Sequence, residues 1–469
     1  MATLETTERR ARASPSNDPR RAYGRGRSRV AANMTPNVSP AGGLPPSLSN
    51  EANVIPYLNA RSGWSPSIIV TPGGGPGGDG GDYGSNTPNS ATQGINEALQ
   101  SCAKAGGVVV VQAGNYALKG TLTIPSNVAL VLQGATLTAG VSLPNMIVFK
   151  NNASLVGYGT IDGNRLAGTI VYMATGGRLV GFGGVLLIQK NAFGQKYFCG
   201  INISNCTDVE VSHLSLFETS IGVNGLIRGS FTDLRVTIAT DLAANVQNRR
   251  PIYVVANAGP TSFLKFSRVH VDGGNAQSET LMAFDGGEHG PITNCSVSDC
   301  SWDNALANSV ADGLDVVGCD GVTVTGCVTS RVCDGISVCG ASNVTLVSNV
   351  ARMCSASGLS LGDGSIVAVT KRLMVTGNVC VSNGTKPGGS LSSKTGIAVI
   401  SAPGSTTSDI MIVGNICVDE GKGIQLYGVY IDTIPSNVYT NANHLRGNGT
   451  AGYHYAGANA TVTVQNNLI

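Results

Sequence analysis

Residues 313–318 read GLDVVG, and the same pattern returns as GISVCG (335–340), GLSLGD (358–363), GIAVIS (396–401) and GIQLYG (423–428). Each segment has Gly, an aliphatic residue, a small or polar residue, and a second aliphatic residue. Successive segments are offset by 22, 23, 38 and 27 residues. Alternation of apolar and polar residues is typical of strands, and Gly marks the turns between them. The longest offset predicts an inserted loop at residues 380–395.

A second set of segments runs beside the first. It comprises VTVTGCV (322–328), VTLVSNV (344–350), LMVTGNV (373–379), IMIVGNI (410–416) and VTVQNNL (462–468). The sixth position of these segments holds Cys327, Asn349, Asn378, Asn415 and Asn467. A period of 20–30 residues with two short strands indicates a parallel coil. Equivalent side chains then stack at the strand repeat of about 4.8 Å, and stacked Asn side chains can hydrogen-bond along the column.

The helix pattern is confined to one short segment before these strands. In SATQGINEALQSCAKAGG (90–107), Ile95, Ala98, Leu99 and Cys102 share one helical face, and Gly106 and Gly107 end the segment. A solenoid needs a cap over its open end. We therefore predict an all-β parallel β-helix (solenoid) with a short N-terminal capping helix at 90–104.

Composition limits the class of protein. The chain has 469 residues, 63 Gly, 12% charged residues and a net charge of +2. Few charges argue against both a wholly disordered chain and a solvated helical bundle. The balanced charge indicates no polyanionic partner for the chain as a whole, and no run of about 18 apolar residues predicts a membrane span.

The chain divides into three parts by composition. Residues 1–30 contain eight Arg and no Lys, which predicts a basic arm that binds nucleic acid, docks on a larger assembly, or is a solvated tail. Residues 31–89 are rich in Gly, Pro, Ser and Asn, and we expect a neck or linker. Residues 90–469 form the predicted β-helix. The N-terminus has no apolar h-region, so we expect no Sec signal peptide.

The 12 Cys residues are expected to be reduced. Their spacing matches neither a disulfide framework nor a zinc motif, and several lie within strand-like segments. We expect no metal and no cofactor. Asp315 and Asp320 offer oxygen ligands for Ca²⁺ together with Asp312, but no EF-hand loop or Gly-Gly-x-Gly-x-Asp array accompanies them.

The run TQGINEALQSCAKAGGVVVVQAGNYALKGTLTIPSNVALVLQGATL (92–137) resembles the opening of the pectin lyase-like, right-handed parallel β-helix superfamily. Members of this superfamily include pectate lyases, polygalacturonases and bacteriophage tailspikes. The resemblance covers about residues 90–469 and implies a right-handed coil. It is specific for fold and weak for function, because this fold hosts lyases, hydrolases, epimerases and adhesins.

Part of a polygalacturonase-like constellation accompanies that resemblance. Polygalacturonases carry Asn-Thr-Asp-Gly, Gly-Asp-Asp and Gly-His-Gly motifs on successive coils, and ADGLD (311–315), CDGIS (333–337) and SGLS (357–360) follow in the same order. Asp312 and Asp334 match the first-motif Asp and one Asp of the second motif. Cys333 stands in place of the other Asp, and Ser357 in place of the His. The resemblance therefore implies catalytic roles for Asp312 and Asp334 only.

The spacing of these two residues supports a carboxylate pair independently. Asp312 and Asp334 are 22 residues apart, each directly before the repeated Gly, so they should stack about 4.8 Å apart. Like charges that close raise the pKa of one carboxyl group. A separation of about 5 Å is the geometry of a retaining glycosidase. The alternative is that each Asp only caps the turn before its Gly.

A second group of residues is a candidate substrate-binding cluster. Asp285, Glu288 and His289 lie in the Gly-rich segment DGGEHG, followed by Trp302 and Asp303. An acid, a base and a stacking aromatic ring suit a sugar, whereas a solvated loop is the plainer interpretation.

These observations favour a virion appendage, a tailspike-like or fibre-like protein that recognises host-surface polysaccharide. The Arg-rich arm and the neck precede the coil where tailspike-like proteins attach to the particle, so residues 1–89 would contact other virion proteins. Resemblance to tailspikes implies a homotrimer. The alternatives are an active polysaccharide hydrolase or lyase, virion-borne or extracellular by a non-Sec route, and a purely structural capsid or cell-surface protein.

Overall fold

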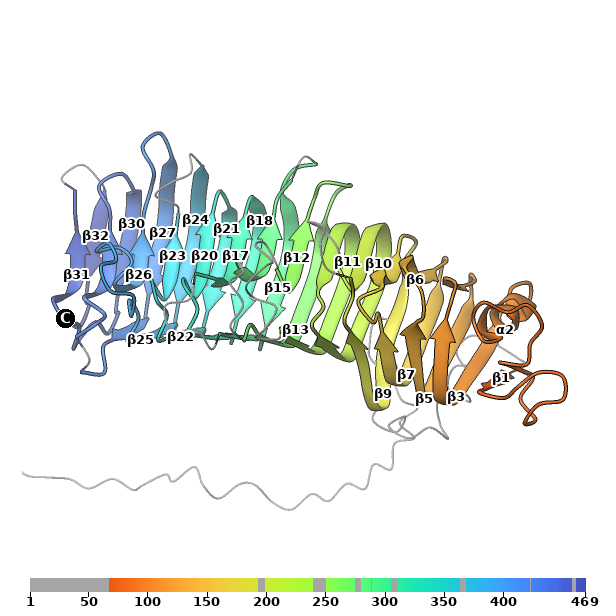
Figure 1. Cartoon of the computed structure of the whole chain (residues 1–469). Coiled ribbons are helices and arrows are strands. Elements are labelled where there is room, and N and C mark those ends of the chain that lie inside the picture. The colour runs from red at the N-terminus through yellow and green to blue at the C-terminus, as the bar shows by residue number, and fades with distance from the viewer. Residues whose placement is uncertain are drawn as a thin grey trace, which may run out of the picture. The chain divides into compact units, whose positions relative to one another are not determined.

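The computed structural model describes residues 67–192, 199–238, 250–274, 280–287, 289–304, 310–362, 368–421, 423–457 and 461–469. The predicted basic arm (1–30), the first part of the predicted neck (31–66) and Glu288 lie outside these residues. In the described part, parallel strands stack coil upon coil, which confirms the predicted parallel β-helix (Figure 1). Within the same part, no helix is long and apolar enough to cross a membrane.

Each coil contributes to three parallel sheets. Sheet 1 contains β4 (Leu122–Ile124), β6 (Leu143–Phe149), β8 (Ala167–Met173), the first residues of β10 (Ile201–Phe217) and β11 (Ile221–Thr237), β12 (Ile252–Val255), β14 (Thr280–Asp285), β17 (Asp312–Val317), β20 (Ile336–Cys339), β23 (Leu359–Leu361), β26 (Thr395–Val399), β29 (Tyr427–Ile431) and β31 (Ala451–Tyr455).

Sheet 2 begins with β1 (Ser67–Thr71), which also pairs with β2 (Tyr83–Gly84). It continues through β3 (Gly107–Leu118), β5 (Val128–Ala139), β7 (Ala153–Asp162), β9 (Gly177–Gln189), β10, β11, β13 (Ser262–Asp272), β15 (Ile292–Ser298), β18 (Cys319–Thr325), β21 (Ser342–Val347), β24 (Val369–Thr376), β27 (Thr406–Val413), β30 (Ser436–Asn441) and β32 (Val462–Gln465).

Sheet 3 is formed first by the C-terminal halves of the long strands β3 to β13. Short separate strands then continue it: β16 (Ser301–Asp303), β19 (Val328–Ser330), β22 (Val350–Arg352), β25 (Val379–Val381) and β28 (Ile416–Val418). Inward aliphatic side chains of all three sheets form one continuous core. On sheet 2 this core includes Val344, Leu346, Leu373, Val375, Ile410 and Ile412, all of which are buried.

The N-terminal cap begins earlier than its sequence indicates. The helix α2 (Ile95–Cys102) is shorter than predicted but buries the predicted face, Ile95, Ala98, Leu99 and Cys102. Residues 67–89, expected as neck, hold β1 and β2, and Val70 is fully buried. The boundary at residue 90 therefore moves towards the N-terminus. Glycine and proline around this strand concealed it, because SIIVT alone is too short to stand out among turn residues.

An asparagine ladder fixes the turn after sheet 2. Asn349, Asn378 and Asn415 each donate a side-chain N–H and a backbone N–H to the Oδ1 atom of the next Asn, at 2.8–3.0 Å. The next rung after Asn415 is Asn443, which donates in the same way to Asn467. Sequence alignment missed Asn443, because Thr440 replaces the aliphatic third residue of its segment. All twelve Cys are free thiols, in agreement with the expected reduced state.

Candidate active site

Asp312 and Asp334 lie on neighbouring coils, at the N-terminal ends of the sheet 1 strands β17 and β20, as their spacing predicts. The backbone N–H of Asp334 donates to Oδ1 of Asp312 at 2.7 Å. The backbone N–H of Ser357, one coil further, donates to Oδ1 of Asp334 at 2.8 Å, and the Ser357 hydroxyl donates to the same oxygen. One oxygen of each carboxylate therefore caps the following coil, which is the turn-capping role that the sequence left open.

Burial makes Asp312 a proton-binding group. Its pKa lies well above the usual range, first because burial disfavours the charge and then because of the negative charges of Asp334 and Asp315. The like-charge effect expected from the sequence is present, but burial is the larger cause. Cys333, in the position of the missing family Asp, is a thiol whose pKa is raised to about 12, first by burial and then by the negative charges of Asp312 and Asp334. It is therefore neutral at physiological pH and cannot act as the second carboxylate.

Asp315 is a further candidate proton donor, which the sequence analysis named only as a possible Ca²⁺ ligand. Its neighbours Leu314 and Val316 are fully buried in the core, so Asp315 points outward from β17. Its Oδ1 atom is buried and has no hydrogen-bond partner among the described residues. Burial raises its pKa to about 7, against the opposing effects of Asp312 and Arg250. The available signal was its place in GLDVVG, where the third residue faces away from the core.

These three residues form the candidate active site, defined as Asp312, Asp315 and Asp334. A carboxylic acid with a pKa near neutrality can donate a proton, while an ionised neighbour acts as nucleophile or base. Sheet geometry fixes all three side chains, since Asp312 and Asp315 share β17 and Asp334 begins the next coil. The arrangement is chemically suited to acid–base work on a sugar chain and equally suited to hydrogen-bonding sugar hydroxyls.

Asp285 lies on the preceding coil of sheet 1 and is neutralised there. Its Oδ2 atom lies 3.3 Å from Nη1 of Arg250 and accepts a hydrogen bond from the Tyr253 hydroxyl at 3.2 Å. The Arg250 guanidinium also lies over the Tyr253 ring, 4.6 Å from its centroid. His289 follows in an exposed turn, where its backbone N–H donates to the Ala256 carbonyl.

Trp302 and Asp303 do not join Asp285 and His289. Both lie on β16 of sheet 3, and the Trp302 side chain is only 1% exposed, within the core. An indole ring pointing inward offers no face to a sugar, so the stacking role expected for Trp302 is wrong. The Asp303 carboxylate accepts hydrogen bonds from Ser330 and from the Arg331 guanidinium. The period-two alternation within β16 separates the two side chains onto opposite faces of the sheet.

An aromatic cluster follows Asp315 along the outer face of sheet 1. In strand register, Asp315 is followed by Ser337, Ser360, Ala398, Tyr430 and His454 on successive coils. The His454 ring stacks on the Tyr430 ring with centroids 5.2 Å apart, and the ring centroids of Tyr427 and His454 are 4.7 Å apart. We call this row, from Asp315 to His454, the outer row. The sequence pattern did not reveal the aromatic cluster, because its members lie on two coils.

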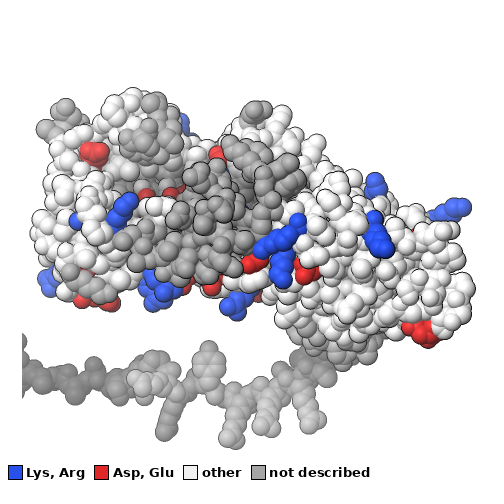
Figure 2. Space-filling model, viewed as in Figure 1, with Lys and Arg blue, Asp and Glu red and all other residues white. Residues whose placement is uncertain are grey.

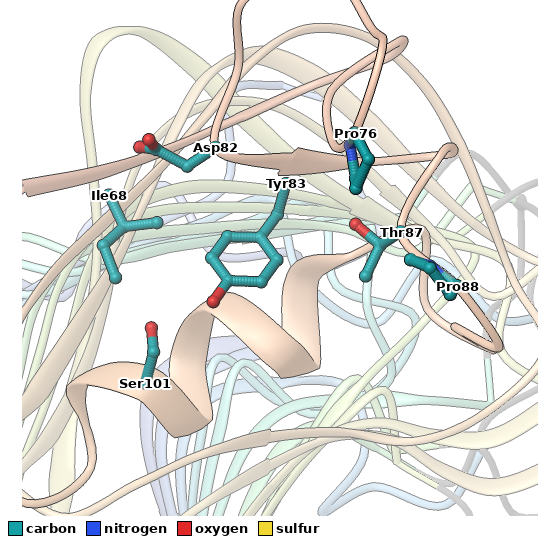
Figure 3. A pocket seen from close by; sticks show the side chains of 7 residues that line it. All are labelled: Ile68, Pro76, Asp82, Tyr83, Thr87, Pro88 and Ser101. Atoms are coloured by element: carbon teal, nitrogen blue, oxygen red, sulfur yellow. The ribbon is translucent and has the colours of Figure 1, made fainter.

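A pocket of about 590 Å³ lies elsewhere, beside the N-terminal cap (Figure 3). Its lining includes Ile68, Tyr83 and Pro88, and Ser101 reaches it from α2. Its carboxylate, Asp82, accepts a hydrogen bond from the backbone N–H of Ile69 at 2.8 Å. Among the described residues that line the pocket, Asp82 is the only carboxylate. Figure 2 shows that Lys, Arg, Asp and Glu are sparse on the face in view, consistent with a chain that is 12% charged.

Comparisons with known proteins agree with this fold. Residues 267–409 match the family model described as the right handed beta helix region. A search of curated protein sequences finds no significant match. Solved structures with a similar fold include tailspike protein 3 of bacteriophage CBA120, with 12% identity, a TM-score of 0.49, and coverage of 82% of this chain and 60% of that chain.

Two further similar structures are enzymes. The catalytic unit of a GH87 α-1,3-glucanase from Streptomyces thermodiastaticus has 15% identity and a TM-score of 0.42, and the match covers 92% of this chain and 70% of that one. An exopolygalacturonase from Thermotoga maritima has 11% identity and a TM-score of 0.43, and the match covers 80% of this chain and 88% of that one. At these identities the likeness concerns the fold, so function must be argued from this chain's own residues.

Proposed function

We propose that this parallel β-helix, whose residues 267–409 match the right handed beta helix region, is a virion appendage that recognises a host-surface polysaccharide along sheet 1. The observation that carries this proposal is the outer row. Its middle members have small side chains, and Tyr430 and His454 form an aromatic platform at one end. Aromatic faces pack against the apolar faces of sugar rings, while serine and carboxyl groups hydrogen-bond sugar hydroxyls.

The spacing of the row suits an extended, repeating ligand. Successive members are one coil apart, about 4.8 Å. Asp315 and Ser337 at one end of the row and Tyr430 and His454 at the other are partly exposed, whereas Ser360 and Ala398 between them are 4% and 1% exposed, so a ligand would contact the row at its two ends. Partial exposure of Tyr430 and His454 leaves ring surface open to a ligand. The attachment role rests on the composition of the chain before β1, with its Arg-rich residues 1–30 and Gly/Pro-rich residues that follow. A homotrimer, which the resemblance to tailspikes implies, completes the proposal.

Binding of full-length protein to a panel of neutral and acidic bacterial surface polysaccharides tests the recognition role. Tyr430→Ala and His454→Ala should each weaken binding about tenfold or more, since each removes ring surface from the platform. Tyr439→Ala is the matched control, because Tyr439 is a partly exposed tyrosine on sheet 2. Equal loss in all three variants, or binding unaffected by the platform variants, would contradict the proposal. Light scattering of the intact chain tests the trimer, and a stable monomer would refute it.

A second candidate function is cleavage of the same polysaccharide. The observation that favours it is the candidate active site, where burial raises the pKa of Asp312 and Asp315. One of these groups would donate a proton to the leaving oxygen, and an ionised carboxylate would act as nucleophile or base. Asp312→Asn, Asp315→Asn and Asp334→Asn should each lower the rate of reducing-end release by 10²-fold or more while binding persists. If wild-type protein binds polysaccharide but releases no reducing ends, the protein is an adhesin.

A further inference from the structure

Two outward faces of neighbouring sheets carry apolar side chains on three consecutive coils near the C-terminal end. Their strands are β21, β24 and β27 on sheet 2, which lie side by side in Figure 1, and β22, β25 and β28 on sheet 3. We call the two sets of residues the sheet 2 flank and the sheet 3 flank. The sheet 2 flank comprises Val347, Met374, Met411 and Val413, and the sheet 3 flank comprises Val350, Val379, Val381, Ile416 and Val418.

Both flanks are open to solvent. Met374, Met411 and Ile416 are 45%, 47% and 40% exposed, and the valines of the flanks are partly exposed. Their neighbours on the same strands, such as Val375 and Cys380, point inward and are fully buried. The flanks are therefore a surface of the folded chain and not a part of its core.

The same columns carry polar side chains on earlier coils. Strand register leads back from the sheet 3 flank, in this order, to Val328, Ser301, His270 and Arg235. On sheet 2 it leads back from Val347 to Thr325 and Ser298. Because the strands form with polar residues at these outward positions, strand propensity alone does not explain the apolar ones. A contiguous exposed apolar surface marks an interaction site.

The turn between the two flanks carries almost no side-chain bulk. Ser348, Gly377 and Gly414 lie at its crest, exposed and with positive φ, on the same three coils. The larger side chains of this turn belong to the asparagine ladder, which is buried. Another chain can therefore approach both flanks without meeting a projecting side chain at the turn.

The absence of charge indicates what kind of surface fits the flanks. The two outward columns of sheet 2 run from Ser296 to Thr463 and from Ser298 to Gln465, and the structure describes every position in them. Neither column contains Asp, Glu, Lys or Arg, and neither does the described sheet 3 column from Ser301 to Ile416. Arg352 lies in the adjacent column, at the border of the sheet 3 flank. A charged partner would lose hydration here without gaining an ion pair, so the fitting surface is itself uncharged and apolar.

We propose that the two flanks are the contact between copies of this chain, with the sheet 2 flank of one copy against the sheet 3 flank of the next. Each flank then meets an apolar, uncharged surface at the same height on a parallel neighbour. Contact between two different faces is heterologous, and it closes into a ring when every copy uses both faces. The inference rests on the homotrimer of the proposed function and assigns the surface that holds it together.

The area of the two faces favours a closed ring over a pair of copies. Seven coils of sheet 2 at about 4.8 Å, by two columns about 7 Å apart, give on the order of 450 Å². Five coils of sheet 3 give on the order of 300 Å² by the same measure. A stable interface buries about 800 Å² on each partner. A ring approaches that area because every copy contributes both faces, whereas a pair joined through one face of each copy reaches about half of it.

Light scattering of the full chain, with a charge placed on one flank at a time, tests the contact. Met374→Glu and Val379→Lys change one residue on each flank of the same coil. Wild type should have three times the chain mass of 47.8 kDa, and each single variant should fall to the mass of one chain. The double variant should regain the wild-type mass, because Glu on one copy then opposes Lys on the next. Val185→Glu, at a valine that is 61% exposed on β9, is the matched control and should keep the wild-type mass.

The double variant guards against misfolding, because a second charge does not restore a chain that fails to fold. Loss of mass in both single variants without recovery in the double variant would overturn the opposed arrangement of the flanks. Sensitivity to Met374→Glu alone would mean that like flanks pair, which contradicts the ring. Wild-type mass in both single variants would place the contact elsewhere on the chain and overturn the inference.

Polysaccharide binding separates this inference from the proposed function. Tyr430 and His454 lie on sheet 1, so the platform is present in a dissociated chain as well. A trimer that dissociates and recovers as expected but binds no polysaccharide would confirm the contact and contradict the recognition role. A wild-type monomer that binds polysaccharide would overturn the contact and leave recognition intact.

Discussion

Asn378 donates its backbone N–H and its side-chain amide to one atom, Oδ1 of Asn415, at 2.9 and 3.0 Å. Asn415 repeats the pattern towards Asn443 and also donates to the carbonyl of Val375. Both side chains are fully buried. Each Asn of the ladder therefore accepts hydrogen bonds from the Asn of the preceding coil and donates hydrogen bonds to the Asn of the following coil. The stacking of these coils depends on Asn at this turn position.

Removing one rung should destabilise the fold. Asn415→Ala removes the acceptor of the Asn378 backbone N–H and of one side-chain N–H, while the Asn378 amide keeps its bond to the Leu346 carbonyl. We expect a loss of about 2–4 kcal/mol in the free energy of unfolding. Chemical denaturation followed by circular dichroism measures it. Asn115→Ala, an exposed position on β3, is the matched control and should stay within about 0.5 kcal/mol of wild type. A similar small effect at Asn415 would show that the ladder contributes no net stability.

Asp315 predicts a stability that falls as the pH rises. Burial raises its pKa to about 7 in the folded chain, against about 3.9 when unfolded. The folded state therefore binds the proton more tightly, and stability decreases between about pH 4 and pH 8. Asp315→Asn mimics the neutral acid and should be more stable than wild type by about 2–4 kcal/mol at pH 8.

The pH dependence of that difference is the decisive measurement. At pH 5 Asp315 is protonated in the folded chain but largely ionised in the unfolded chain, so the advantage of Asp315→Asn should shrink to about 1.5 kcal/mol, and it should vanish only below about pH 4. Thermal unfolding of both proteins at the two pH values gives the comparison. An advantage that is equal at pH 5 and pH 8 would mean that Asp315 does not titrate in this range.

Two substitutions at Asp334 distinguish its structural role as a turn cap from its proposed catalytic role. Asn at this position retains an Oδ1 acceptor for the backbone N–H of Ser357, whereas Ala removes it. We expect Asp334→Asn to leave Tm nearly unchanged and Asp334→Ala to cost about 1–3 kcal/mol in the free energy of unfolding. Calorimetry of the two variants tests this. Equal Tm values for Asn and Ala would remove the capping role.

Trp302 should contribute to stability and not to recognition. Its side chain fills the core on β16, so Trp302→Ala should cost about 3–5 kcal/mol in the free energy of unfolding. Polysaccharide binding by the folded fraction should be unchanged, in contrast with Tyr430→Ala. A selective loss of binding with normal stability would restore the stacking role that its burial now excludes.

The repeat pattern was sufficient for the fold because a solenoid is built from local, periodic rules. Gly-aliphatic alternation predicted the sheet 1 strands between residues 313 and 401, and the Asn column predicted the turn after sheet 2. The alignment of GIQLYG (423–428) was wrong, because Ile397 pairs with Val429 and the equivalent strand is β29, which begins later along the chain. The pattern failed where a rung departs from it, as at Asn443, and where a short strand stands among turn residues, as at β1. In both places tertiary pairing decides the structure of a segment that local propensity leaves open.

The sequence by itself determined the parallel coil, the face of the capping helix that is buried, and the stacking of Asp312 on Asp334, because each follows from spacing along the chain. Only the tertiary structure decided that Trp302 is buried, that Asp315 has a pKa near neutrality, and that Tyr430 meets His454. Whether a side chain points into the core, and how deeply it is buried, depends on which segments pack together. The spacing of residues along the chain does not specify this packing, and burial in turn sets the pKa of a carboxyl group.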